Sequence, residues 1–415
     1  MEFREQKVVA NVSSIGLDST EDESTFRIPF LPVLNNFCGR RMYFDSTKIR
    51  VETGGIGIIA SVTKNHLNLR SVSKRELIIE MFKAFGMKAD VSAPGRIASR
   101  LISQMRGIQG CRVFKIPGVR DLLEAYGPQA SFERTSAIQK IGRSDPLTGV
   151  PNFSEYEGLF IEPRESGPLK PEHVLTFLLK RGVFQVGLAF GCPHCELDPW
   201  IPLDDVATEV RCEYCGKIFL TTPQLRDRNW KYRRSGLFGR DNNQEGSIPV
   251  VLTLQQLDNV LSWENLFLTN MTVEPITAQI ESCETDFVLL HQSYWGDTVS
   301  IAIGECKTRN EISDDDVRKL GLVADVFENN GVDAFIVFSK LAPFTTDEIT
   351  RCGRAQSQYR MRVIMLTDRE LEPYFVYERT EKEFMIRSSA VSLEDLADST
   401  DSIYFHPKPR PKPAS

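Results

Sequence analysis

Four of the nine cysteines fall into two pairs with the same internal spacing, and this pattern constrains the fold more than any other in the chain. Cys192 and Cys195 stand in the segment CPHC, Cys212 and Cys215 stand in CEYC, and sixteen residues separate the pairs. Each short loop lets two thiolates approach one ion, and two such loops complete a closed tetrahedron around Zn²⁺. A closed site has no open position for water, so we expect this zinc to support folding and not catalysis.

The residues around these cysteines leave few alternatives to zinc. His194 lies inside the first loop, but four thiolates already complete the site, so we interpret it as a bystander. A redox pair or cysteines buried by chance would be the alternatives, and two correctly spaced pairs favour zinc over both. The five other cysteines stand singly, as expected in a reducing cytosol. Residues 190–218 resemble a zinc ribbon, a class whose members bind DNA, RNA or protein.

The size and charge of the chain limit the class of protein. With 415 residues, 41% hydrophobic and 26% charged, we expect a globular protein of two or three domains. No apolar run approaches the roughly 18 residues of a membrane span, and the N-terminus lacks an apolar signal core, so we predict a cytoplasmic protein without a membrane partner. The formal net charge of -6 excludes a surface uniformly coated in positive charge, but a local basic patch could still bind phosphates.

Changes in composition along the chain predict an α/β multidomain protein. We expect a mobile segment at 1–25, a mixed α+β recognition or regulatory domain at 26–142, a Pro-rich linker at 143–171, a small zinc-ribbon domain at 172–245, an αβ core at 246–380 and a tail at 381–415.

The segment ETDFVLLHQSYWGDTVSIAIGECKTRNE, residues 284–311, has two apolar runs on either side of a Trp-Gly-Asp turn. Alternate residues of a strand share a face, so Glu305 and Lys307 continue the apolar face of the second run. Asp286 begins the corresponding face of the first run. If the turn folds the runs into an antiparallel hairpin, Asp286 lies near Glu305 and Lys307.

Two carboxylates and an ammonium group at one sheet edge can perform a specific reaction. The carboxylates of Asp286 and Glu305 suit Mg²⁺ or Mn²⁺, which would polarise a phosphodiester and acidify a bound water. Lys307 could orient that water or stabilise the developing charge. The alternative is a solvated cross-strand ion pair between Glu305 and Lys307 at a frayed strand end.

The order of strand with Asp, strand with Glu-x-Lys, helix and strand resembles the PD-(D/E)xK nuclease superfamily over about residues 250–370. The resemblance implies a restriction-endonuclease-like core in which Asp286 and Glu305 bind the metal and Lys307 is catalytic. Cys306 would give its backbone carbonyl to the same metal. Thr285 stands where the family often has proline. A further glutamate ligand would be Glu264, although Glu281 and Glu284 compete for that role.

The segment LRDRNWKYRRSGLFGR, residues 225–240, interleaves basic and aromatic side chains. Such a pattern suits a strand of nucleic acid, which offers phosphates to neutralise and bases to stack on. The candidate binding residues are Arg228, Trp230, Lys231, Tyr232, Arg233 and Arg234. A linker strand with core aromatics and solvated arginines explains the pattern equally well.

Three functions are compatible with these features. The first is a metal-dependent endonuclease that acts with a partner protein or as a homo-oligomer. The family resemblance favours DNA over RNA as its substrate and suggests a bacterial defence or restriction system. The second is a nucleic-acid-binding scaffold with a non-cleaving nuclease fold. The third is a protein-interaction adaptor. A complete Asp286, Glu305 and Lys307 set favours the first function, because a scaffold does not need all three.

Overall fold

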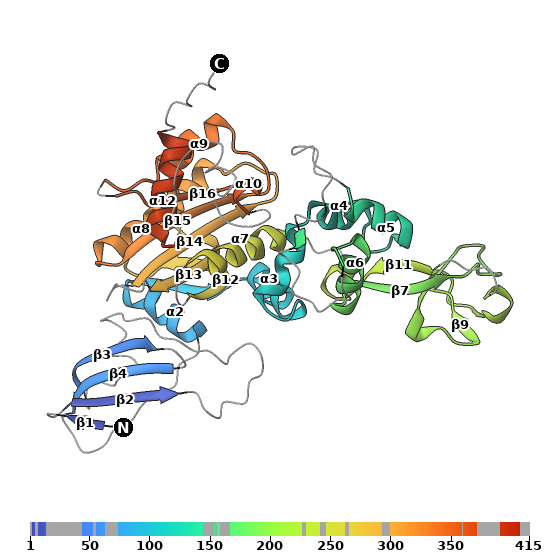
Figure 1. Cartoon of the computed structure of the whole chain (residues 1–415), viewed down its shortest axis with the longest axis horizontal. Coiled ribbons are helices and arrows are strands. Elements are labelled where there is room, and N and C mark those ends of the chain that lie inside the picture. Colours follow the sequence, from blue (N-terminus) through green and yellow to red (C-terminus); the bar gives the residue numbers. More distant parts are fainter. Residues whose placement is uncertain are drawn as a thin grey trace. The chain divides into compact units, whose positions relative to one another are not determined.

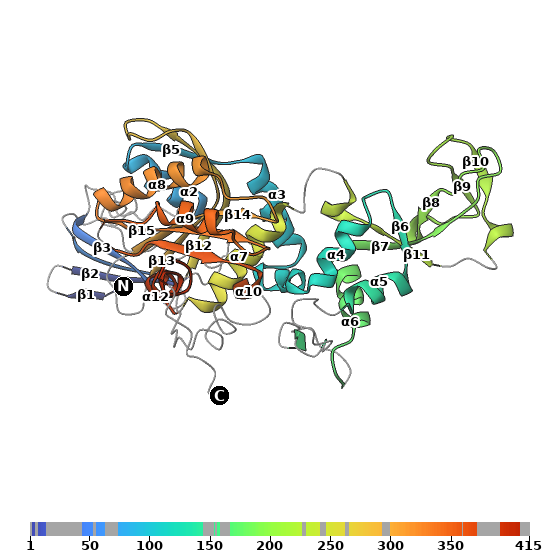
Figure 2. The ribbon, with the colours of Figure 1, turned by 90° about the horizontal axis from the view of Figure 1, so that it is seen from above.

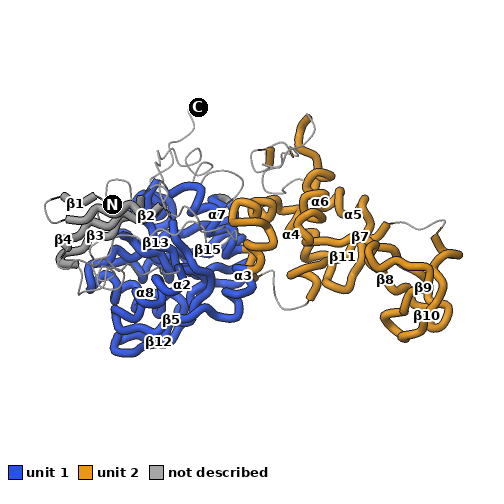
Figure 3. Tube along the Cα trace, turned by 90° about the horizontal axis from the view of Figure 1, so that it is seen from below, with its two compact units in different colours: residues 1–99, 249–415 blue, residues 100–248 orange. Residues whose placement is uncertain are grey.

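The computed structural model describes two compact units, coloured separately in Figure 3. Unit 1 comprises residues 1–99 and 249–415, and unit 2 comprises residues 100–248. The described residues are 74–143, 153, 156, 157, 167–225, 230–240, 246–261, 265–292, 299–358, 360–371 and 391–406, together with the backbone of four N-terminal strands. Among these residues no helix is long and apolar enough to cross a membrane.

The four N-terminal strands form an antiparallel sheet in the order β1-β2-β4-β3. They are β1 (Glu2–Arg4), β2 (Lys7–Ser13), β3 (Phe44–Glu52) and β4 (Gly55–Val62). Residues 1–25, expected from their polar and acidic composition to be mobile, therefore contain two strands. The sequence KVVANVS of β2 is rich in valine, which favours a pleated strand over a mobile segment.

The centre of unit 1 is a six-stranded mixed sheet in the order β16-β15-β14-β13-β12-β5 (Figure 1). Neighbours from β5 to β14 are antiparallel, whereas β14, β15 and β16 run parallel. The strands are β5 (Met87–Val91), β12 (Asn265–Pro275), β13 (Cys283–Gln292), β14 (Val299–Lys307), β15 (Asp333–Lys340) and β16 (Val363–Leu366). The predicted α/β class of the chain is thereby confirmed.

Helices cover both faces of this sheet (Figure 2). On one face, α2 (Lys74–Ala84) and α8 (Asp314–Asn329) bury an apolar core, in which the Phe82 and Phe327 rings meet edge to face at 5.1 Å. On the other face, α7 (Ser247–Val260) places Thr253 Oγ1 2.6 Å from Ser339 Oγ of β15. The remaining helices are α3 (Ala93–Gln104), α9 (Thr346–Gly353), α10 (Asp368–Leu371) and α12 (Leu393–Thr400), which continues into a π-helical turn (Asp401–Phe405). Burial on both faces explains why β15 reads as a continuous apolar run.

Unit 2 combines short helices with two antiparallel sheets (Figure 2). The larger sheet has the order β6-β11-β7-β8, with β6 (Ser131–Glu133), β11 (Trp230–Arg234), β7 (Phe184–Ala189) and β8 (Trp200–Pro202). The smaller sheet pairs β9 (Glu209–Arg211) with β10 (Ile218–Leu220). The helices are α4 (Pro117–Ala125), α5 (Arg134–Ile141) and α6 (Pro171–Lys180), with 3₁₀ segments at Ile108–Lys115, Leu203–Asp205, Thr222–Gln224 and Gly236–Gly239.

The unit boundaries differ from the segments drawn from the sequence. Helix α2 and strand β5 fall within the expected 26–142 domain, yet β5 pairs with β12 and completes the six-stranded sheet. The rest of that domain, from residue 100, joins the cysteine segment in unit 2. This pairing places Asp90 opposite Thr272, which is far away in the chain. Changes in composition along the sequence do not indicate which distant strands pair, so they could not predict this boundary.

Candidate functional site

The four cysteine sulfurs of unit 2 converge on one point. Their sulfur atoms all lie within 4.8 Å of one another, and the pairs Cys192–Cys215 and Cys195–Cys212 are each separated by 3.7 Å. A tetrahedron of sulfurs about 2.3 Å from zinc has edges of about 3.8 Å. The cluster is therefore consistent with a structural zinc site. Among the described residues it is the only group of three or more His, Cys, Asp or Glu side chains whose ligand atoms lie close enough together to hold one metal ion.

The two loops that present these sulfurs repeat one backbone design. In the first loop, Glu196 N–H donates to the Cys192 carbonyl at 2.9 Å; in the second, Gly216 N–H donates to the Cys212 carbonyl at 3.0 Å. The residue after the second cysteine takes a left-handed conformation in both, with φ of 61° at Glu196 and 72° at Gly216. Each loop thus turns both of its thiols toward the same point.

Two of the four thiols have pKa values that depart from the ordinary value. Burial opposes ionisation of Cys192, but the backbone amides of His194 and Cys195 outweigh it and lower its pKa to about 7. The Leu197 amide favours the Cys195 thiolate, yet burial and the neighbouring sulfurs raise that pKa to about 12. A cation bound between the sulfurs would favour the thiolate form of Cys195, which its surroundings otherwise disfavour. His194 is exposed and lies 3.3 Å from the Ile218 carbonyl, in agreement with its expected bystander role.

In unit 1 the predicted hairpin is present. Strands β13 and β14 pair antiparallel with Phe287 opposite Gly304, which sets Asp286 opposite Glu305. The three apolar residues Val299, Ile301 and Ile303 share the buried core, as expected for the face that Glu305 continues. The turn between the strands, 293–298, lies outside the described residues.

Both oxygens of Asp286 accept hydrogen bonds. The Cys306 backbone N–H donates to Oδ2 at 2.6 Å, and the side-chain amide of Asn270 donates to Oδ1 at 2.5 Å. Beside it, the Thr285 hydroxyl accepts a hydrogen bond from Gly304 N–H at 3.1 Å. These contacts lock β13 to β14 at this level and restrict rotation of the Asp286 carboxylate.

Glu305 and Lys307 form an ion pair on the same face of β14. Glu305 is 8% exposed, whereas Lys307 is half-buried. Helix α8 adds a third carboxylate, because Asp316 Oδ2 lies 3.9 Å from the Lys307 ammonium nitrogen. Asp316 is held there by the N-terminal cap of α8, in which its carboxylate accepts the Ser313 N–H at 3.0 Å.

Burial and neighbouring charges disfavour ionisation of Asp286 and Glu305. Burial raises the pKa of Asp286 to about 6, partly offset by the Cys306 amide. Burial and then the charge of Asp286 raise the pKa of Glu305 to about 8, against the attraction of Lys307. Burial opposes the charge on Lys307, but Glu305 and Asp316 outweigh it and raise the pKa of the ammonium. A divalent cation would relieve the repulsion between the carboxylates.

The donor set fits a hard divalent cation. Mg²⁺ commonly binds through one or two carboxylates and fills its remaining positions with water and substrate phosphates. Asp286 and Glu305 offer two such carboxylates on neighbouring strands. Each carboxylate oxygen of Asp286 has a lone pair beyond the one used by its hydrogen bond, so those contacts do not prevent it from binding an ion.

Of the three additional glutamates, the structure describes Glu281 and Glu284. Glu264, predicted as a further ligand, lies outside the described residues. Glu281 forms a bidentate ion pair with Arg318 of α8, with one contact of 2.9 Å. Glu284 is exposed on β13, two residues before Asp286. The role of Glu264 stays a prediction.

Several residues of the predicted nucleic-acid-binding segment lie in β11 and have partners within unit 2. Lys231 pairs with Glu133 at 2.6 Å. Arg233 is buried, donates from Nε to the Pro128 carbonyl at 3.0 Å, and has its guanidinium over the Trp200 ring at 5.5 Å. These contacts give the two cations local structural roles.

The rest of that segment differs from both interpretations of the sequence. Tyr232 is buried and stacks on Phe132, as a core aromatic would, whereas Trp230 is exposed. Arg234 is buried and not solvated. Arg228 lies outside the described residues. Trp230 is about half exposed, and nucleic-acid binding by this segment stays a prediction.

Three residues beside the Asp286 site were not found by sequence reasoning: Asn270, Thr285 as a hydrogen-bonding residue, and Asp316. The sequence does contain an indication of Asp316, because the run SDDD is typical of a capped helix N-terminus and follows closely after Glu-x-Lys. Asn270 had none, because nothing in LFLTNMTV marks one residue as special.

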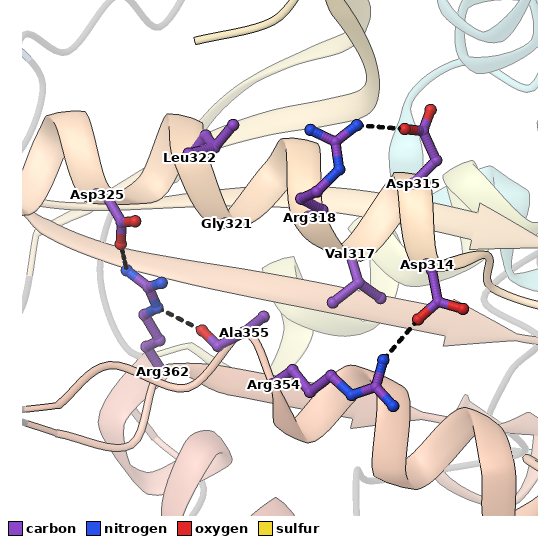
Figure 4. A pocket seen from close by; sticks show the side chains of 10 residues that line it. All are labelled: Asp314, Asp315, Val317, Arg318, Gly321, Leu322, Asp325, Arg354, Ala355 and Arg362. Carbon is purple, nitrogen blue, oxygen red and sulfur yellow. Dashed lines mark hydrogen bonds and ion pairs between the residues drawn. The ribbon is translucent and has the colours of Figure 1, made fainter. Parts of the chain in front are cut away.

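A cavity of about 560 Å³ lies between α8 and the segment that follows α9, and its lining includes none of Asp286, Glu305 and Lys307. Figure 4 shows that its charges pair with one another. Arg354 meets Asp314 at 2.8 Å, and Arg362 meets Asp325 at 2.7 Å. We assign no catalytic role to this cavity.

No protein-family model matches the sequence, and no curated protein matches it. Two solved structures align with most of the chain. One is the protein VC1899 from Vibrio cholerae, with 13% identity and a TM-score of 0.31 over 80% of this chain and 67% of that one. The other is Can2 from Sulfobacillus thermosulfidooxidans in complex with cyclic tetra-adenylate, with 12% identity and a TM-score of 0.25 over 78% of this chain and 64% of that one. At these TM-scores neither alignment bears on the assignment of a function.

Proposed function

We propose that the protein is a metal-dependent nuclease that hydrolyses phosphodiester bonds at the Asp286, Glu305 and Lys307 cluster. The observation that carries this proposal is the β13–β14 register, which sets Asp286 opposite Glu305 beside Lys307. An ordinary surface ion pair would not bury one carboxylate against another, because the charge of Asp286 raises the pKa of Glu305.

Each residue has a role that follows from its position. Asp286 and Glu305 would hold the divalent cation, which polarises the phosphodiester and acidifies a water when bound. The Cys306 amide keeps Asp286 oriented from the neighbouring strand. Lys307 is half-buried at the end of β14, where its ammonium group can orient the attacking water and stabilise charge on the phosphate in the transition state.

The substrate and the biological role are proposed from the family resemblance. DNA is the preferred substrate because most of the family that the sequence resembles cuts DNA, and a role in bacterial defence or restriction rests on the same resemblance.

The four-cysteine cluster would hold Zn²⁺ and stabilise the end of unit 2. Residues 190–225 contain six acidic and two basic side chains, so this ribbon is poorly suited to phosphate binding and better suited to a protein partner.

The test is cleavage of supercoiled plasmid, linear duplex, single-stranded DNA and RNA with Mg²⁺ or Mn²⁺. We expect Asp286→Ala and Lys307→Ala to lose at least about 100-fold in rate. Asp347→Ala on α9 and Lys319→Ala on α8 are matched controls, since they remove a carboxylate and an ammonium elsewhere in unit 1, and should cut at the wild-type rate.

Two results would contradict the proposal. Cleavage that survives both site substitutions would move the chemistry elsewhere. If no substrate is cut, binding decides between the remaining functions: affinity that falls steeply with salt and survives both substitutions indicates the nucleic-acid-binding scaffold. Neither cutting nor binding would leave the protein-interaction adaptor.

A further inference from the structure

Asn270 of β12 faces the proposed metal site from the opposite side to Glu305. Its neighbours Thr269 and Met271 pair with Phe287 and Thr285 of β13, which sets Asn270 directly across from Asp286. Its side chain is buried, and its amide nitrogen donates to Asp286 Oδ1 at 2.5 Å. Asp286 is therefore held between the Asn270 amide and the Cys306 backbone amide, one on each oxygen.

The backbone of Asn270 is strained. Its φ is 20°, a positive value that residues with a side chain rarely adopt. On one side of it Leu266 and Leu268 face the apolar core, and on the other side Met271 and Val273 face the same core. The alternation of side chains along β12 therefore shifts by one residue at this position, where an unbroken strand would keep one parity.

The surrounding structure maintains this conformation. The Asn270 carbonyl accepts Ser92 N–H at 2.9 Å, and the Thr269 hydroxyl donates to the Gly95 carbonyl at 2.7 Å. The first turn of α3 approaches so closely that a Cβ on Gly95 would lie 2.4 Å from the Asn270 carbonyl oxygen. A strained residue persists only where its neighbours determine it in this way, and such residues are concentrated at functional sites.

We propose that Asn270 is the positioning residue of the metal site and holds the Asp286 carboxylate in its ion-binding orientation. This inference rests on the proposed function. The competing explanation is purely structural, because asparagine tolerates positive φ better than most residues. Glycine would serve that purpose as well, whereas only asparagine also supplies an amide donor to Asp286.

The two explanations separate in the variant Asn270→Gly, which accepts the backbone conformation but removes the amide. We expect Mn²⁺ affinity, measured by calorimetry on protein free of nucleic acid, to fall about 10- to 100-fold. The melting temperature should stay equal or rise, because glycine relieves the strain. Asn265→Ala is the matched control, since Asn265 also lies on β12 but contacts His291 at the far end of the strand, and its Mn²⁺ affinity should equal that of the wild type.

Each outcome bears on a definite claim. Wild-type Mn²⁺ affinity in Asn270→Gly would overturn the positioning role, even if Asp286→Ala binds no Mn²⁺ and the proposed function holds. A loss of affinity matched by a large drop in melting temperature would also count against it, since a structural role predicts both. If the wild type binds no Mn²⁺ and cuts nothing, the proposed function fails and this inference fails with it.

Discussion

The four-cysteine cluster of unit 2 and the carboxylate cluster of unit 1 are assembled by opposite routes. The cysteines come from two short loops, and each loop shapes itself through hydrogen bonds between residues four or five positions apart. The carboxylate cluster draws on β12, β13, β14 and α8, and its side chains meet because the three strands pair in one register and α8 packs beside them. The first site depends mainly on local backbone geometry, and the second depends on the register of a whole sheet.

Stability follows the same contrast. Metal binding to four thiolates contributes folding free energy, because the unfolded chain does not hold the four sulfurs together around the ion. Without a metal, a charged Glu305 lowers the free energy of unfolding, because its carboxylate is buried beside that of Asp286. The cysteine site should therefore stabilise the protein, whereas the carboxylate site should destabilise it until a cation binds.

The largest expected effect comes from removing the zinc site. Cys212→Ser should abolish zinc binding and unfold the ribbon, because metal binding supplies folding free energy of about 10 kcal/mol or more in small zinc domains. Zinc content by mass spectrometry and limited proteolysis would show the loss. His194→Ala should keep one zinc per chain. Full zinc content in Cys212→Ser would refute the interpretation of the four cysteines as a closed zinc site.

Two lysines at adjacent strand ends give the next effect. Lys340 pairs in register with Lys307 but is buried, and it donates to both oxygens of Glu348 at 3.0 Å. Lys340→Met should lower the free energy of unfolding by about 3–5 kcal/mol, because it leaves a buried carboxylate without its cation. Lys307→Met should cost less, since Glu305 can take up a proton instead. Urea unfolding of both variants would check this order, and the reverse order would mean that Lys307 has the structural role.

A pH series tests whether the carboxylate site is a cost. The pKa of Glu305 is raised from 4.5 to about 8 in the folded protein, so its contribution to stability is present below pH 4.5 and is lost as the pH rises toward 8. Glu305→Gln has no such loss and should exceed the wild type by at least about 1 kcal/mol at pH 8 without Mg²⁺ or Mn²⁺. The advantage should shrink toward pH 5. Unfolding is measured without chelator, so that zinc stays bound. An equal difference at both pH values would refute a buried, charged Glu305.

The smallest effect compares the two cysteine loops with each other. Gly216 and Glu196 occupy the same left-handed position, where a residue with a Cβ costs about 1 kcal/mol. Glu196→Gly should therefore raise the free energy of unfolding of the zinc-loaded ribbon by up to about 1 kcal/mol, and Gly216→Ala should lower it by a similar amount. Chemical unfolding followed by tryptophan fluorescence measures both. Equal stability in all three proteins would refute the cost of a Cβ at this position, and an effect in only one variant would mean that the loops are not equivalent.

The sequence was sufficient where a pattern repeats with a fixed local period. Cysteine spacing predicted which four thiols converge, because a two-residue loop allows little other geometry. Alternation along residues 284–307 predicted that Asp286 meets Glu305, because a hairpin turn sets the register of the strands that it joins. The N-terminal cap of α8 is equally local, since the Ser313 side chain accepts the N–H of Asp316 three residues further on.

Only the tertiary structure decided the rest. The pairing of β5 with β12 joins residues that are nearly two hundred positions apart, and this pairing moved the expected domain boundary. The shift in β12 at Asn270 depends on the first turn of α3 pressing against the strand, so the local sequence does not record it. The burial that raises the pKa of Glu305 comes from the assembled sheet and helices. Short-range geometry is encoded by residue spacing, whereas register shifts, burial and charge coupling arise only when distant segments pack together.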